Sequence, residues 1–303
     1  MAKLTPFGVE LRKLRLDKEM RLLDLAEKME QSTAFVSAIE TGRKQIPDSY
    51  LHKVAKAMEL SADETRRLRT AAEKTRKEVR VDSLSGDQRE LVAAFARKLD
   101  DVPSAMIEAL KKIVLKSIGA ETPFFRKRRG IVVPPMSTTA LRTFADKVRS
   151  VFVPDDRIDF PIMEVLEFKL TKILPDFFID VEEVEEMDGD EARVYAGSDS
   201  IVFRKDVYEG ACRGNRRDRF TACHEFAHFL MHRDVKLARA REDGDKIYTD
   251  SEWQADEFAG TLMMSPRHLK QFNCPEDAAD ACNMNPAAAR VMWSKYTKEG
   301  KIT

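Results

Sequence analysis

The chain has 303 residues, and its 52 Lys and Arg balance 52 Asp and Glu, so the formal net charge is zero at pH 7. This length predicts two domains, and a hydrophobic content of 43% supplies enough apolar side chains for a core in each. The sequence has no signal peptide, no apolar run that spans a membrane and no Cys-x-x-Cys pair. We therefore expect a cytoplasmic protein with reduced thiols and no membrane partner.

The first 80 residues are basic and predict a group of short helices. They contain 18 Lys and Arg against 13 Asp and Glu, a difference of +5, which leaves −5 on the rest of the chain. Apolar residues recur at helical spacing up to about residue 62, and Gly42 follows one of these runs, as is usual after a helix. A basic helical segment of this kind indicates a partner with negative charge, such as nucleic acid.

This segment resembles the XRE-type helix-turn-helix over about 55 residues. The matching pieces are Leu25-Ala26, Val36-Ser37-x-Ile39-Glu40-x-Gly42-Arg43 and Val54-Ala55-x-Ala57. The resemblance assigns residues 1–80 to a DNA-binding domain whose recognition helix turns Thr33, Ala34 and Ser37 toward the base edges of an operator. Arg12, Arg43 and Lys44 would meet phosphates. Leu22 and Glu30 stand where the family often has Gln and Gly, so a protein-binding or vestigial module is the alternative.

Residues 81–120 predict a helical connector. The basic stretch before it, residues 66–80, indicates either a solvated helix face or a clamp on the DNA backbone. Two amphipathic helices are expected at about 87–100 and 103–118, and their apolar stripe would form a homodimer interface or close the N-terminal core. Gly, Pro and basic residues mark 119–136 as an exposed linker, where self-cleavage would be sought first.

Residues 121–303 predict a second domain that contains both helices and strands. Helices are expected at about 137–151 and 162–172, followed by strands at 177–184, 192–196 and 201–204. The last two strands predict a hairpin whose edge would bind an extended peptide by β-augmentation. Residues 233–250 predict a mobile loop, and residues 275–297 a helical cap with a break before Pro286.

The stretch from Arg219 to His232 predicts a helix that carries metal ligands. No Gly or Pro interrupts it, and His224 and His228 lie four residues apart, which places both imidazoles on one helix face. Glu225 follows the first histidine and can hold a water molecule instead of binding the ion. This is the H-E-x-x-H arrangement of zinc peptidases, in which the glutamate is the general base. Two helix histidines without a metal are the alternative.

A catalytic zinc also needs a third protein ligand and an open position for water. The apolar residues from Ala255 to Leu262 recur at offsets 0, 3, 4 and 7, which predicts an amphipathic helix. Glu252 and Asp256 share its polar side, so Glu252 is the predicted ligand and Asp256 the predicted acceptor of a hydrogen bond from a ligand histidine. Asp234 is a weaker candidate, because Met231 stands where such a ligand set needs a glycine to turn the chain.

These motifs resemble the ImmA/IrrE family of metallopeptidases from about residue 125 to 270. The matching pieces are Arg129-Gly-Ile-Val-Val-Pro-Pro135, Arg219-Phe-Thr-x-x-His-Glu-x-x-His228, Glu252-x-x-Ala-Asp-x-Phe-Ala259 and Leu262-Met-Met-Ser-Pro266. The resemblance implies a small zincin fold with His224, His228 and Glu252 as ligands and Glu225 as base. Asp256 stands where the family more often has Asn. In its best-known members the family cleaves a repressor and so releases stress or mobile-element genes.

We therefore expect a multidomain protein with an all-α helix-turn-helix N-terminal domain and an α+β zincin-like metallopeptidase domain. The expected function is DNA-binding regulation combined with gluzincin-like, Zn²⁺-dependent cleavage of a repressor, an antitoxin or the chain itself. The alternative is a non-catalytic helix-turn-helix regulator whose metal-binding domain senses a signal or binds a partner.

Overall fold

The computed structural model describes residues 3–75, 131–233 and 246–302, which fall in one compact unit. The predicted connector helices at 87–100 and 103–118, most of the predicted linker and most of the predicted loop at 233–250 lie outside the described residues. Among the helices that are described, none combines the length and the apolar character that a membrane span requires.

The N-terminal part is all-helical, as the sequence predicted. Its helices are α1 (Pro6–Asp17), α2 (Leu22–Lys28), α3 (Thr33–Glu40), α4 (Tyr50–Ala57) and α5 (Ala62–Thr75). Ser32 caps α3 by accepting a hydrogen bond from the Phe35 N–H. Glu30, in the turn between α2 and α3, has a φ of 54°, a left-handed conformation that favours glycine. This conformation explains why glycine is common at that position in helix-turn-helix domains.

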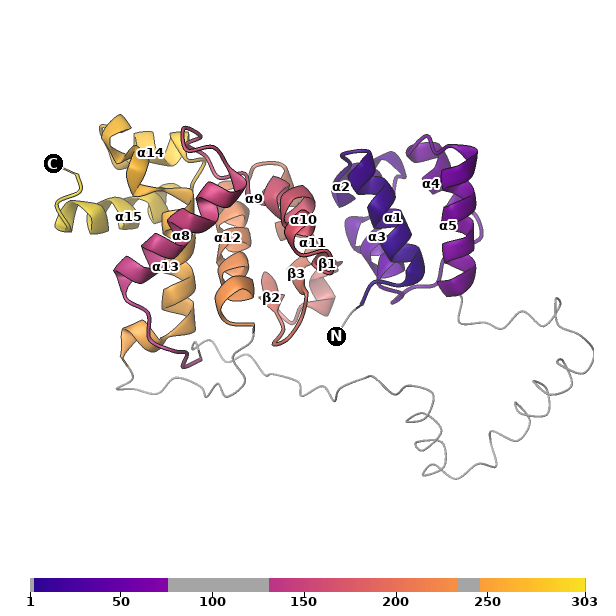
Figure 1. The fold of residues 1–303 in the computed structure, drawn as a ribbon, viewed down its shortest axis with the longest axis horizontal. Helices are drawn as coiled ribbons and strands as arrows, with labels where there is room; N and C mark the ends of the chain where they lie inside the picture. The colour runs from indigo at the N-terminus through magenta and orange to yellow at the C-terminus, as the bar shows by residue number, and fades with distance from the viewer. Residues whose placement is uncertain (1–2, 76–130, 234–245, 303) are drawn as a thin grey trace, which may run out of the picture. The chain divides into compact units, whose positions relative to one another are not determined.

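The C-terminal part contains a small mixed sheet, shown with its flanking helices in Figure 1. The strands are β1 (Phe178–Glu182), β2 (Ala192–Val194) and β3 (Ser200–Arg204), in the order β1-β3-β2. β3 pairs parallel with β1, with Phe178 opposite Ser200, and antiparallel with β2, with Val194 opposite Ile201. β2 is therefore an edge strand of the described sheet, and it forms the hairpin with β3 that the sequence predicted.

Helices cover the sheet and form the rest of the domain. Before the sheet come α8 (Thr138–Phe152) and a continuous helical segment made of α9 (Ile162–Glu164), the π-helix η3 (Val165–Lys169) and α10 (Leu170–Ile173). The short 3-10 helix η4 (Val184–Glu186) follows β1. After β3 come α11 (Lys205–Cys212), α12 (Arg216–Met231), η5 (Ile247–Thr249), α13 (Ser251–Met263), η6 (Pro266–Gln271), α14 (Pro275–Ala281) and α15 (Pro286–Lys298).

Helices α12 and α13 run side by side, and α8 packs against α13 (Figure 1). The two helices bury apolar side chains such as Phe226, Phe229 and Phe258 between them and their neighbours. The N-termini are fixed by side-chain caps, because Asn215 accepts from the first N–H groups of α12 and Asp250 accepts from the Glu252 N–H of α13. These caps fix where each helix begins and so position the polar side chains of both helices.

Candidate metal centre

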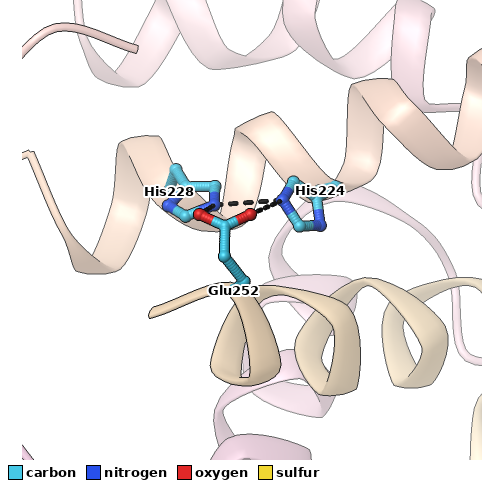
Figure 2. Close-up of side chains that lie close together, drawn as sticks. All are labelled: His224, His228 and Glu252. Carbon is cyan, nitrogen blue, oxygen red and sulfur yellow. Dashed lines mark hydrogen bonds and ion pairs between the residues drawn. The ribbon is translucent and has the colours of Figure 1, made fainter. Parts of the chain in front are cut away.

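Three side chains from α12 and α13 converge on one point, as Figure 2 shows. His224 and His228 lie one turn apart on α12, and their Nε2 atoms are 3.0 Å apart. Glu252, in the first turn of α13, places Oε2 3.3 Å from His224 Nε2 and Oε1 3.5 Å from His228 Nε2. The structure thus brings together the three residues that the sequence singled out as ligands.

The separations within this cluster fit a tetrahedrally bound divalent ion. Ligand atoms about 2.0–2.2 Å from a tetrahedral zinc lie roughly 3.3 Å from one another. The observed separations are close to that value: 3.0 Å between the two imidazole nitrogens, and 3.3 and 3.5 Å from these nitrogens to the two oxygens of the Glu252 carboxylate. Among the described residues, no other group of three His, Cys, Asp or Glu side chains is placed to hold an ion. Two imidazole nitrogens and one carboxylate oxygen leave a fourth position for water or substrate.

His224 is oriented by Asp256. The Nδ1 of His224 lies 2.8 Å from Asp256 Oδ1, so Nδ1–H donates to the carboxylate and Nε2 turns toward Glu252 and His228. Burial lowers the pKa of His224, but its hydrogen bonds with Asp256 and Glu252 outweigh this effect and raise the pKa to about 10. Burial acts to raise the pKa of Glu252, yet the two histidines hold it well below its usual range.

His228 is oriented through a longer chain of hydrogen bonds. Its Nδ1 lies 3.0 Å from Nδ1 of His232, and the Nε2 of His232 lies 3.0 Å from Gln254 Oε1. The Gln254 Nε2 donates to the carbonyl oxygens of Pro134 and Tyr248, at 2.9 and 2.8 Å. Because the amide donates from nitrogen, its oxygen accepts from His232 Nε2–H, and His232 Nδ1 must then accept from His228 Nδ1–H. This direction leaves the Nε2 lone pair of His228 free to bind an ion.

The neutral form of His232 agrees with this assignment. Burial, together with the nearby His228, lowers the pKa of His232 to about 4, so the ring is uncharged at neutral pH and can accept at Nδ1. His232 also lies at the C-terminal cap of α12. No motif in the sequence marks Gln254 as part of the site.

The predicted general base, Glu225, is buried on α12 beside His224, with 3% of the residue exposed. After the hydrogen bonds with Asp256 and Glu252, the charge of Glu225 is a further cause of the raised pKa of His224. Glu225 directly follows the first histidine of the cluster in the chain, and the described part of the molecule buries it on the same helix.

Three of the six residues predicted to contact DNA contact the C-terminal part instead, away from the metal cluster. Thr33 Oγ1 donates to Glu209 Oε1 at 2.9 Å, and Ser37 Oγ donates to Asp180 Oδ1 at 2.7 Å. Arg43 Nη2 donates to Asp180 Oδ1 at 2.5 Å and to the carbonyl oxygen of Val181 at 3.1 Å.

The other three predicted DNA contacts differ in exposure. Ala34 is buried, and Lys44 lies over the Phe35 ring with Nζ 5.3 Å from the ring centroid. Arg12 is also buried, and this burial, with the neighbouring Arg15, lowers the pKa of its guanidinium to about 10. In this conformation, Arg12 and Ala34 are therefore not on an exposed surface.

Family models match both parts of the chain. The helix-turn-helix domain model matches residues 6–68, and the IrrE N-terminal-like domain of the Peptidase_M78 family matches residues 179–277. The second match includes Glu225 and all three side chains of the metal cluster. No curated protein matches the chain significantly. The expected fusion is confirmed: the chain joins an N-terminal helix-turn-helix domain to a C-terminal IrrE-like domain of the M78 peptidase family.

Proposed function

We propose that the chain is a transcriptional regulator that also acts as a zinc-dependent endopeptidase, with a repressor, an antitoxin or its own chain as substrate. The observation that carries the proposal is the convergence of His224, His228 and Glu252 at zinc-ligand separations, with the Glu225 carboxylate buried next to them. The helix-turn-helix domain supports DNA binding, which would bring the peptidase to an operator or to a partner bound there.

The chemistry is divided between the cluster and Glu225. A zinc ion held by the two histidines and Glu252 would polarise the scissile carbonyl group and lower the pKa of a bound water. Glu225 accepts the proton of the attacking water and passes it to the leaving amine nitrogen. Asp256 holds His224 in the tautomer that leaves Nε2 free for the ion.

The edge of the sheet supports a protein substrate. β2 pairs on one side with β3, and it packs against α12, the helix that carries His224 and His228. β2 is an edge strand of the described sheet, and an extended peptide that added a strand beside it would lie near the cluster. The side-chain preference of this binding mode would come from pockets on alternate positions of the added strand.

The proposal is tested by metal content and by proteolysis in the same three proteins. We expect about one zinc per chain in the wild type and in Glu225→Gln, and loss of zinc in Glu252→Ala, because two imidazoles alone form an incomplete site. New protein N-termini should form in cell extract with the wild type and be reduced at least about a hundredfold with Glu225→Gln.

Glu276→Gln is the matched control, because Glu276 is an exposed glutamate paired with Arg290 outside the cluster. It should behave as the wild type in both measurements. Full proteolysis by Glu225→Gln that still holds its zinc would contradict the assigned base. Metal content that does not respond to Glu252→Ala would contradict the ligand set.

A further inference from the structure

An acidic surface of the C-terminal part binds the recognition helix α3 and the arginine that follows it. We call this surface the docking face and define it by acidic residues of β1, of the segment after β1 and of α11: Asp180, Glu182, Glu183, Glu186 and Glu209. α3 packs directly on β1, within the same compact unit. Every side chain of the docking face named here contacts a hydroxyl or guanidinium group of residues 32–43.

The contacts cover the part of α3 that reads base edges in a helix-turn-helix complex with DNA. Thr33 and Ser37 are each 1% exposed, and Asp180, which accepts from Ser37, is fully buried. Ser37 is bonded twice, because its Oγ also accepts from the Val181 N–H at 3.0 Å. Ser32, at the cap of α3, donates to Glu183 at 3.0 Å. A DNA duplex cannot reach these side chains while they remain in this position.

The docking face presents to Arg43 what a DNA backbone would present. The guanidinium meets Asp180 at 2.5 Å, the Val181 carbonyl at 3.1 Å, Glu186 at 3.6 Å and Glu182 at 3.8 Å. Phosphate groups bind a recognition helix in the same way. They place several anionic oxygens around an arginine and accept hydrogen bonds from short hydroxyl side chains. The carboxylates of the docking face thus take the positions of phosphates.

We propose that the docking face and duplex DNA compete for the same side chains of α3, so that the protein binds DNA only after α3 has left the docking face. This inference rests on the DNA binding proposed above for the helix-turn-helix domain. The docking face acts as an internal competitor. The apparent DNA affinity is then the intrinsic affinity multiplied by the fraction of molecules whose α3 is free.

The polar character of the contact makes the exchange reversible. Buried ion pairs and hydrogen bonds give a small net stabilisation, because each group loses its hydration when the contact forms. Asp180 Oδ2 is moreover buried with no hydrogen-bond partner among the described residues, which lowers the stability of the docked arrangement. Phosphates and water can replace each contact that α3 loses on leaving.

The first test compares Asp180→Asn with Asp280→Asn in the full-length protein. Both changes remove one negative charge, but Asp280 is an exposed residue paired with Arg216, outside the docking face. Binding is measured by fluorescence anisotropy with duplex DNA of mixed sequence, about 30 base pairs long, at about 50 mM salt, where sequence-independent binding is strong. We expect Asp180→Asn to bind at least about tenfold more tightly than the wild type, and Asp280→Asn to bind as the wild type does.

A second measurement uses the unmodified protein, so that it remains valid if Asp180→Asn does not fold. Hydrogen exchange of residues 178–184 is followed with and without the same DNA. Release of α3 deprives the Val181 N–H of its Ser37 acceptor, so we expect faster exchange in this segment when DNA binds. A further variant, Glu209→Gln, changes the partner of Thr33 and, like Asp180→Asn, should bind DNA more tightly than the wild type.

The outcomes separate this inference from the function on which it rests. Equal DNA affinity of wild type and Asp180→Asn, with unchanged exchange at 178–184, would overturn the competition and leave DNA binding intact. Absence of binding by every protein at low salt would remove the DNA-binding function and the competition with it. Tighter binding by Asp180→Asn but not by Asp280→Asn, with faster exchange at 178–184, supports both.

Discussion

At the scale of single residues, Gln254 determines the protonation pattern of a histidine it does not touch. Its amide group donates to two backbone carbonyls and therefore accepts from His232, and this direction continues to His228. Partners of this kind, one step removed from the ion, hold a metal-binding ring in one tautomer and one orientation.

Gln254→Leu is therefore expected to weaken zinc binding about 10- to 100-fold, because His232 loses its acceptor and His228 loses its fixed tautomer. The measurement is competition with a chelator of known zinc affinity. Gln271→Leu is the matched control, because Gln271 is exposed and its side chain contacts His268 and no metal ligand. Equal zinc affinity of the two variants would show that the Gln254 chain does not position His228.

Two pairs of the candidate site could be predicted from the sequence because helical periodicity is local. Residues four apart on a helix lie on the same face, independent of the rest of the fold. This rule pairs His224 with His228 and Glu252 with Asp256. Gln254 could not be found in this way. Its role depends on the segment at Pro134, 120 residues earlier in the chain, which folds back over the start of α13.

At the scale of secondary-structure elements, Gly8 lets α1 approach α3. A Cβ atom at this position would lie 2.1 Å from the carbonyl oxygen of Glu40, at the end of α3, and backbone atoms cannot move aside. Gly260 in α13 is also crowded, but its added Cβ would meet the end of the flexible Met292 side chain at 2.6 Å. The two glycines therefore tolerate alanine to different degrees.

Gly8→Ala should lower the free energy of unfolding of the N-terminal helices by about 1–3 kcal/mol, because overpacking outweighs the gain in helix propensity of about 1 kcal/mol. Gly260→Ala is the control and should cost less than about 1 kcal/mol and less than Gly8→Ala, since Met292 can change its rotamer. Urea unfolding followed by circular dichroism gives both values. Equal stability of the two variants would show that α1 and α3 separate freely at Gly8.

The sequence predicted most elements and missed those whose conformation depends on their surroundings. The three strands and the hairpin followed from β-branched and aromatic residues bounded by turn residues, and the structure confirms them. Helix α11 was not predicted. Its eight residues lie between a strand and a longer helix, and so short a segment does not show a clear helical periodicity. The π-helix at Val165–Lys169 lies inside a predicted helix, and spacing alone does not distinguish it from the α-helix on either side.

At the scale of the whole molecule, the two parts of the chain carry opposite net charge, and some of these charges form contacts between the parts. The excess of +5 in residues 1–80 and of −5 in the rest of the chain suggested that the first part binds nucleic acid. The structure shows that some of these opposite charges meet inside the protein, as Arg43 does with Asp180 and Glu182. Sequence reasoning had no means of predicting this contact, because Ser37 and Asp180 are 143 residues apart and neither residue belongs to a repeating pattern.

The metal cluster and the docking face share no residue, so their effects should be independent. We expect Glu252→Ala to lose zinc while its DNA affinity stays within about twofold of the wild type, and Asp180→Asn to retain zinc while its DNA affinity rises. In the double variant the two changes in binding free energy should add to within about 0.5 kcal/mol. The measurements are zinc content and DNA anisotropy for the wild type, both single variants and the double variant.

This set of four proteins also discriminates between the two functions considered for the chain. A protease delivered to DNA needs zinc for cleavage and not for DNA binding, whereas a metal sensor must bind DNA differently with and without its ion. One path for coupling between the two sites is α11, which contributes Glu209 to the docking face and leads into α12. Another is the sheet, because β1 pairs with β3 and β3 contacts α12. A change in DNA affinity of tenfold or more in Glu252→Ala, about 1.4 kcal/mol, would establish such coupling and favour the regulator that senses a metal. Independence would favour the peptidase, because the cluster would then have no effect on DNA binding and its function would be chemical.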